Sequence, residues 1–141
     1  MAIGRPSGIA RAITEAAVAE GAEVTVAGRD AAKLRQAYDE NENVHAETAD
    51  ITDDATIRSL AERTGTVDHV VTTASARARG LLRTSTARRC GCPFDTKVIG
   101  PVMLARHFAP RINEGGSITL FSGVLPDGVA QPSHNRHFVS D

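Results

Sequence analysis

The chain has 141 residues, 41% of them hydrophobic, and a formal net charge of -1 at pH 7. These values predict one globular domain and argue against nucleic acid or a membrane surface as a partner. No stretch reaches the length of a membrane span and the N-terminus lacks a signal-peptide pattern, so we expect a cytoplasmic protein. Cys90 and Cys92 lie too close in sequence for an ordinary disulfide and are interpreted as reduced thiols.

Helical and strand-like patterns alternate along the chain. The first predicted helix is alanine-rich and ends at Gly21, where a positive φ is favourable. Asp30 is the expected N-cap of the second helix, and Thr52 or Asp53 that of the third. Strands separated by helices of this length predict parallel crossovers and a doubly wound α/β sheet. The expected elements are a helix over 7–20, a strand over 22–28, a helix over 30–41, a strand over 43–50, a helix over 52–65, a strand over 67–75, a helix over 94–112 and a strand over 116–123.

Two segments break this alternation. Residues 81–93 contain three arginines and both cysteines without any periodicity, and residues 125–141 are polar, aperiodic and predicted to be a disordered tail. We therefore expect one domain over residues 1–124. The arginines of 77–89 lack interleaved aromatic residues and are interpreted as solvated. His134 and His137 lack a third ligand, so no metal site is predicted.

Several motifs resemble the short-chain dehydrogenases/reductases. The stretch "IGRPSGIA" is similar to the family's T-G-x-x-x-G-I-G loop, with Ala10 in place of the last glycine. "GAEVTVAGRD" resembles the second strand with its cofactor-selecting end, and "VVTTAS" stands where the family has N-N-A-G. "DTKVIG" aligns with V-N-x-x-G, and "GSITLFSG" resembles the fifth strand. The resemblance covers residues 3–124 and implies a Rossmann-like sheet with helices on both faces.

The glycine loop and the second strand point to a nucleotide cofactor. A helix N-terminus can hold a pyrophosphate if Gly4 and Gly8 let the backbone come close. Arg29 stands where an acidic residue would bind the 2′-hydroxyl of NAD, so NADP is predicted over NAD. The alternatives are a flexible N-terminal turn and a solvated Arg29. Asp50 either accepts a hydrogen bond from the adenine, as the resemblance implies, or caps the helix that follows. The expected cofactor-binding residues are Gly4, Ser7, Gly8, Ile9, Arg29, Asp50, Thr73 and Ala74.

The family's catalytic residues have no counterparts at the aligned positions. The serine position falls on Gly123 and the asparagine on Lys97, while the tyrosine and lysine positions fall on Arg136 and Ser140. An arginine cannot act as the general acid or base. The only tyrosine is Tyr38, in the second predicted helix. No catalytic residue is assigned, and Ser122, which is expected to face the other side of its strand, is the one candidate.

Only three residues precede Gly4, whereas a buried parallel strand usually needs about five. We expect the first strand and the C-terminal strands to be largely missing, and a truncated copy carrying frameshifts would explain this together with both aperiodic segments. A family-type homo-oligomer is not expected without the C-terminal half. Two functions are carried forward. One is an NADP-dependent oxidoreductase acting on a small carbonyl or hydroxyl substrate, and the other is a catalytically inactive nucleotide-binding remnant.

Overall fold

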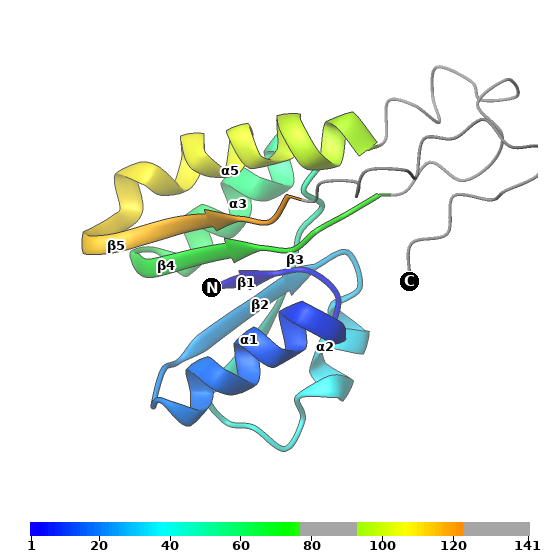
Figure 1. The fold of residues 1–141 in the computed structure, drawn as a ribbon, viewed down its shortest axis with the longest axis vertical. Helices are drawn as coiled ribbons and strands as arrows, with labels where there is room; N and C mark the ends of the chain where they lie inside the picture. The colour runs from blue at the N-terminus through cyan, green and yellow to red at the C-terminus, as the bar shows by residue number, and fades with distance from the viewer. Residues whose placement is uncertain (77–92, 123–141) are drawn as a thin grey trace, which may run out of the picture.

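The computed structural model describes residues 1–76 and 93–122, which form a parallel sheet with the strand order β3-β2-β1-β4-β5 (Figure 1). Every neighbouring pair of these strands is parallel, so the predicted doubly wound α/β fold is confirmed. The strands are β1 (Ala2–Ile3), β2 (Val24–Gly28), β3 (Val44–Thr48), β4 (Val67–Thr72) and β5 (Ile112–Leu120).

Helices cover both faces of the sheet (Figure 1). α1 (Gly8–Ala19) and α2 (Ala31–Ala37) lie on one face, and α3 (Asp54–Thr64) and α5 (Gly100–Phe108) lie on the other. A π-helical turn, η2 (Asp95–Ile99), precedes α5, and a short 3-10 helix, η3 (Ala109–Arg111), follows it. All four predicted helices are therefore present.

The predicted starts and ends of the helices are correct at several residues. Gly21 and Gly65 follow α1 and α3 with φ values of 84° and 71°, which glycine adopts without strain. Asp30 caps α2 by accepting a hydrogen bond from Lys33 N at 3.1 Å. Asp53 caps α3 by accepting from Ala55 N at 3.0 Å. Asp50 lies three residues earlier, so the alternative in which Asp50 caps this helix is wrong.

β1 is short, as expected, yet it lies in the centre of the sheet. Ala2 pairs with Val26 on one side and Val71 on the other, and both β1 residues are buried. The α-ammonium of Met1 donates to His69 O at 2.7 Å, and its partial burial lowers its pKa from the ordinary value of 8.0. Met1, next to β1, is therefore also bonded to β4.

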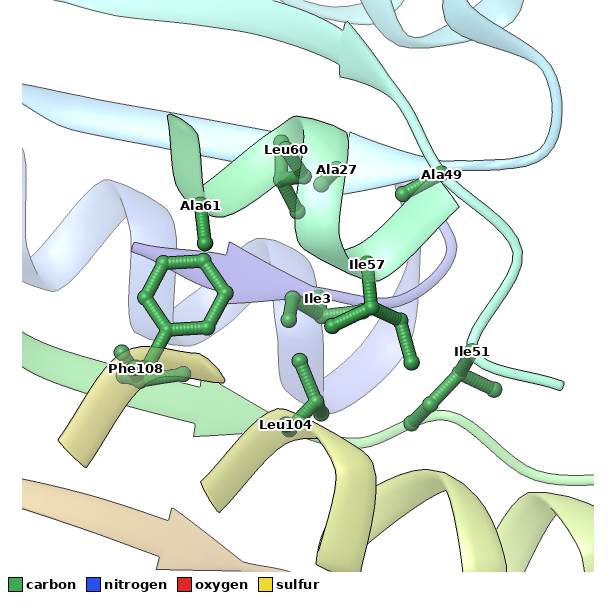
Figure 2. Packing of buried hydrophobic residues seen from close by; sticks show 10 residues of the cluster. Ile3, Ala27, Ala49, Ile51, Ile57, Leu60, Ala61, Leu104 and Phe108 are labelled. Carbon is green, nitrogen blue, oxygen red and sulfur yellow. The ribbon is translucent and has the colours of Figure 1, made fainter. Parts of the chain in front are cut away.

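The larger core cluster lies between the sheet and the helices α3 and α5 (Figure 2). Leu60 and Phe108 are fully buried there, and complete burial of a side chain of this size stabilises a fold by about 1.5–3 kcal/mol. A smaller cluster on the α1 and α2 face includes Val24, Val26 and Leu34. The larger cluster also contains Ile3 and Ala27, and it thereby fixes the strands whose ends carry the candidate site.

The helix predicted over 94–112 forms despite Pro101, but in three parts. Gly100 N donates to Asp95 O five residues earlier, which is the π-helical pattern, and Pro101 then opens α5 without needing an N–H donor. Glycine is required at position 100 because a Cβ atom there would lie 2.5 Å from Ile51 O. This close approach seats α5 against the loop that follows β3.

Candidate functional site

A cavity of about 620 Å³ opens at the carboxyl ends of β1, β2 and β4. Ligands of open parallel α/β sheets bind at this edge, where the strand order reverses on either side of β1. Seven of the eight residues expected to bind a cofactor line the cavity, and Gly8 lies beside it at the start of α1. The seven are Gly4, Ser7, Ile9, Arg29, Asp50, Thr73 and Ala74.

The first turn of the glycine loop is held tightly against two strands. Gly4 N donates to Ala27 O at 3.0 Å, while the neighbouring Ile3 O accepts from Thr73 N at 2.9 Å. A Cβ atom at Gly4 would collide with Thr73 Oγ1 and lie 3.1 Å from the Cβ of Ala10. Glycine is therefore required at position 4, where the methyl group of Ala10 already lies close by.

The loop leads into α1 in a way that leaves the helix N-terminus open. Gly8 has a φ of +57°, and Ser7 before it is an extended N-cap whose side chain makes no capping hydrogen bond. The N–H groups of the first turn of a helix have no intrahelical acceptors, and a bound anion can take that role. Ile9 is 56% exposed beside this turn, so an apolar side chain also faces the cavity.

Two arginines line the cavity, and one of them was not predicted. Arg29 follows Gly28 at the end of β2, and Arg5 follows Gly4 at the end of β1. Both side chains are exposed, and neither forms a hydrogen bond or ion pair with any residue in the described part of the chain. The sequence signal for Arg5 is the repeated Gly-Arg pair, which becomes informative only once β1 and β2 are known to be neighbours.

Asp50 also lines the cavity, but its carboxylate is already engaged. One of its oxygens accepts hydrogen bonds from Thr52 N at 2.9 Å and from Thr52 Oγ1 at 2.8 Å. The backbone N–H of Asp50 in turn donates to Thr56 Oγ1 at 3.0 Å. Asp50 therefore orders the loop between β3 and α3, and its proposed contact with an adenine stays a prediction.

The positions aligned with the family's catalytic residues are only partly described. Ser122 lies beyond the end of β5 at Leu120, so it is not the strand residue that was expected, and the direction it faces stays a prediction. Lys97 donates from Nζ to Phe121 O at 2.9 Å and ties η2 to the chain after β5. Tyr38 packs on the smaller core cluster, away from the cavity. Gly123, Arg136 and Ser140 lie outside the described residues.

Histidines also pair with side chains elsewhere in the described part of the chain. His45 Nε2 lies 2.8 Å from Glu23 Oε1. His69 Nδ1 lies 3.0 Å from Ser117 Oγ between β4 and β5, and His107 Nε2 lies 2.7 Å from Asp54 Oδ1 between α5 and α3. The pairs of His69 and His107 join neighbouring elements, as expected for structural histidines. Residues 1–76 and 93–122 contain no group of three side chains placed to hold a metal ion, nor a helix long and apolar enough to cross a membrane. The two cysteines and the H-x-x-H pair lie outside these ranges.

A parallel sheet with a glycine loop that opens α1, and a cavity at its strand ends, defines the class of dinucleotide-binding α/β domains. The glycine positions fit such a ligand because Gly4 lets the loop pack against β4, and the backbone at Gly8, where no heavy atom would lie within 4 Å of a Cβ atom, is open. A family model described as enoyl-(acyl carrier protein) reductase matches residues 3–137. The chain belongs to the short-chain dehydrogenase/reductase family.

Solved structures with this fold include a carbonyl reductase from Pseudomonas aeruginosa, at 22% identity and a TM-score of 0.70, matching 82% of this chain and 57% of its own. BdcA, crystallised in complex with NADPH, has 22% identity and a TM-score of 0.75 over 83% of this chain and 48% of its own. A short-chain dehydrogenase from Streptomyces avermitilis has 31% identity and a TM-score of 0.68 over 77% of this chain and 43% of its own.

The chain thus spans about half the length of these structures. A search of curated proteins found no match. The family match continues past residue 124 into the segment predicted to be a separate tail. The domain boundary at residue 124 therefore stays a prediction.

Proposed function

We propose that the chain is an NADP(H)-binding domain of short-chain dehydrogenase/reductase type whose hydride-transfer activity is impaired. The observation that carries the proposal is Arg29, an arginine without a partner among the described residues, at the end of β2. A ribose 2′-phosphate is an acceptor suited to a guanidinium, whereas NAD offers only a hydroxyl at that position. One of the similar structures, BdcA, contains NADPH.

The glycine loop supports binding of the pyrophosphate. The N–H groups of the first turn of α1 suit this dianionic group, and the backbone there is open because a Cβ atom at Gly8 would meet no heavy atom within 4 Å. Ile9, more than half exposed at the cavity wall, supplies an apolar surface that a bound dinucleotide would cover. Charge, hydrogen-bond donors and apolar surface therefore meet at one edge of the sheet.

NADPH, when bound, supplies the hydride for reduction of a carbonyl group. The accompanying proton needs an acid, and the family's tyrosine position falls on Arg136, which cannot release a proton at working pH. We therefore expect turnover of carbonyl or hydroxyl substrates by this chain to be very low or absent, with no contribution from Arg136. Loss of a measurable turnover on Arg136→Ala would contradict that expectation.

A second function, a catalytically inactive nucleotide-binding remnant of a truncated or frameshifted gene, is favoured by the same absence of a Y-x-x-x-K pair from the sequence. Binding does not separate the two hypotheses, but turnover does. A low but saturable oxidation of NADPH with a carbonyl substrate would support the impaired enzyme, and its complete absence would support the remnant.

The proposal is tested by fluorescence titration of the full chain with NADPH and NADH. We expect NADPH to bind more tightly by about 1–3 kcal/mol, the range for a hydrogen bond to a charged group, and Arg29→Ala to remove most of this preference. Arg58→Ala is the matched control because it removes one exposed arginine from α3, outside the cavity lining. Tighter binding of NADH than of NADPH would refute the assignment of Arg29.

A further inference from the structure

A second cavity lies at the edge of the described sheet that β3 forms. α2 and α3 cover opposite faces of the sheet and both contact β3 (Figure 1). The cavity between them has a volume of about 490 Å³, and its lining includes Arg35 from α2, Glu47 and Thr48 from β3, and Ser59 and Arg63 from α3. It shares no lining residue with the candidate cofactor site.

Two side chains of this cavity carry donors that no described residue satisfies. Arg35 is exposed on α2 and forms neither a hydrogen bond nor an ion pair with the described part of the chain. Ser59 is half-buried on α3, and its hydroxyl makes no hydrogen bond with those residues either. A guanidinium and a hydroxyl, from helices on opposite faces of the sheet, therefore meet in one cavity with their donors available.

The edge strand adds a backbone donor. Ala49 N donates to Gly28 O on β2, and the backbone groups of successive strand residues point to alternate sides, so those of Thr48 point away from β2. The hydrogen bond from Arg63 Nη2 to Thr48 O at 3.3 Å agrees with this direction. The N–H of Thr48 is therefore a third donor at the cavity.

The charges in the cavity leave one cation uncompensated. Arg63 is bonded to Glu47 Oε2 through Nε at 3.0 Å and through Nη2 at 2.9 Å, so these two residues neutralise each other. Arg35 is the remaining charged residue of the lining, and its charge has no counterpart there. Glu47 Oε1 forms no hydrogen bond with a described residue and stays an acceptor. The cavity thus offers a positive group, two further donors and one fixed acceptor.

We propose that this cavity is a second ligand site, which binds a small phosphate monoester that carries hydroxyl groups. The phosphate oxygens accept from the guanidinium of Arg35, the hydroxyl of Ser59 and the N–H of Thr48, and a planar guanidinium suits a phosphate in particular. A hydroxyl group of the ligand donates to Glu47 Oε1, which Arg63 holds in place. The volume lies in the range of about 300–1,000 Å³ that is usual for small-molecule sites, and it exceeds what phosphate alone would fill.

The test is an NMR titration of the ¹⁵N-labelled full chain with ribose 5-phosphate, inorganic phosphate and ribose. We expect the amide signals of Thr48 and Ser59 to shift with ribose 5-phosphate, because both residues donate to the phosphate. Ribose 5-phosphate should bind about fivefold more tightly than inorganic phosphate, since it adds a hydrogen bond to the Glu47 carboxylate. Ribose alone should cause no saturable shift.

Variants assign the binding to the named side chains. Arg35→Ala should weaken binding of ribose 5-phosphate about tenfold, and Ser59→Ala about threefold, as the loss of a charged and of a neutral hydrogen bond implies. Arg35→Lys should recover part of the loss because it keeps the charge without the planar fork. Arg58→Ala is the matched control, since it removes an exposed arginine of α3 that lines neither cavity, and it should resemble the parent.

The same titrations separate this site from the cofactor site. Arg29→Ala should leave the affinity for ribose 5-phosphate unchanged, and Arg35→Ala should leave that for NADPH unchanged. Weaker binding of ribose 5-phosphate to Arg29→Ala would place this ligand in the cofactor cavity and overturn the inference. An Arg35→Ala variant that binds it as tightly as the parent, equal losses in Arg35→Ala and Arg58→Ala, or equal affinities for ribose 5-phosphate and inorganic phosphate would also overturn it. In none of these cases is the proposed NADP(H) site affected, because its own test uses NADPH, NADH and Arg29.

Discussion

Replacement of Gly4 by alanine tests whether the loop is built as tightly as the structure indicates. The added Cβ would collide with Thr73 Oγ1 and come within 3.1 Å of the Cβ of Ala10, and Thr73 cannot retreat easily because its N–H is bonded to Ile3 O. Overpacking of this kind costs about 1–3 kcal/mol, so we expect Gly4→Ala to lower the free energy of unfolding by that amount in urea denaturation.

A double-mutant cycle assigns this cost to the contact itself. Thr73 Oγ1 makes no hydrogen bond with other described residues, so Thr73→Ala alone should be nearly neutral. The variant carrying both Gly4→Ala and Thr73→Ala loses the collision and keeps only the 3.1 Å contact with Ala10. We expect it to be more stable than the sum of the single changes predicts, by about 1 kcal/mol.

Gly8→Ala provides the comparison within the same loop. A Cβ atom at Gly8 would meet no heavy atom within 4 Å, but the φ of +57° means that alanine there encounters backbone strain of about 1–2 kcal/mol rather than a collision. Thr73→Ala should therefore rescue Gly4→Ala and leave Gly8→Ala unchanged. A Gly4→Ala variant whose stability is indistinguishable from that of the parent, or strict additivity with Thr73→Ala, would refute the reasoning.

Two further predictions concern helix α3. Asp53→Ala removes the N-cap bond and should lower the free energy of unfolding by about 0.5–2 kcal/mol, whereas Ser7→Ala, at an N-cap without a side-chain bond, should be nearly neutral in the same urea titrations. The hydrogen bond from His107 lowers the pKa of Asp54 below its ordinary value of 3.8, so its stabilising effect is present above that pH and is lost as the pH falls through the folded-state pKa. Asp54→Asn should accordingly have a lower free energy of unfolding than the parent at about pH 6, and this difference should shrink below about pH 4. The exposed control Asp39→Asn should show no such pH dependence. A difference for Asp54→Asn that does not change with pH would contradict the role given to the hydrogen bond from His107.

The order and type of the elements were predictable because each strand and helix has its own hydrophobic period. The end of α2 was not, since the prediction continued to residue 41 while the helix ends at Ala37. The last expected turn of the helix is replaced by a non-helical turn. In this turn Asn41 N donates to Tyr38 O, and Asn43 N donates to the Asn41 side chain at 3.1 Å. Asparagine side chains can bind nearby backbone N–H groups and so favour turns over helix. The Asn41 side chain does so here, just after the end of α2.

The start of β5 could not be read from the sequence either. The strand begins at Ile112, although Asn113 to Gly116 have little preference for strands. Pairing with β4 holds these residues in the strand. The pairing includes a register shift after Val67 and a hydrogen bond from Asn113 Nδ2 to Asp68 Oδ1 at 2.8 Å. Gly116 is needed there because a Cβ atom would collide with Asp68 O. These are tertiary contacts, which local periodicity does not report.

For the site, motif spacing predicted which residues would gather but not how the charges would be arranged. The glycine loop, Arg29 and Thr73 were recognisable because each ends or follows a strand at a family-like interval. Arg5 was not predicted to line the cavity, because the Gly-Arg pair after β1 becomes informative only once β1 and β2 are known to be neighbours. Asp50 was recognisable as a loop residue, but the bond between its carboxylate and Thr52 depends on the turn that the loop adopts.

The short first strand limits the site less than its length suggests. β1 pairs only with the carboxyl halves of its neighbours, and Val24 and Val67, at their amino ends, have no β1 partner within the described residues. The bonds that β1 does make, from Gly4 N to Ala27 O and from Thr73 N to Ile3 O, lie at the cavity end of the sheet. Preorganisation of a ligand site depends on the groups that border it. The backbone that shapes the glycine loop is therefore anchored on both sides, even though the strand leading into it is two residues long.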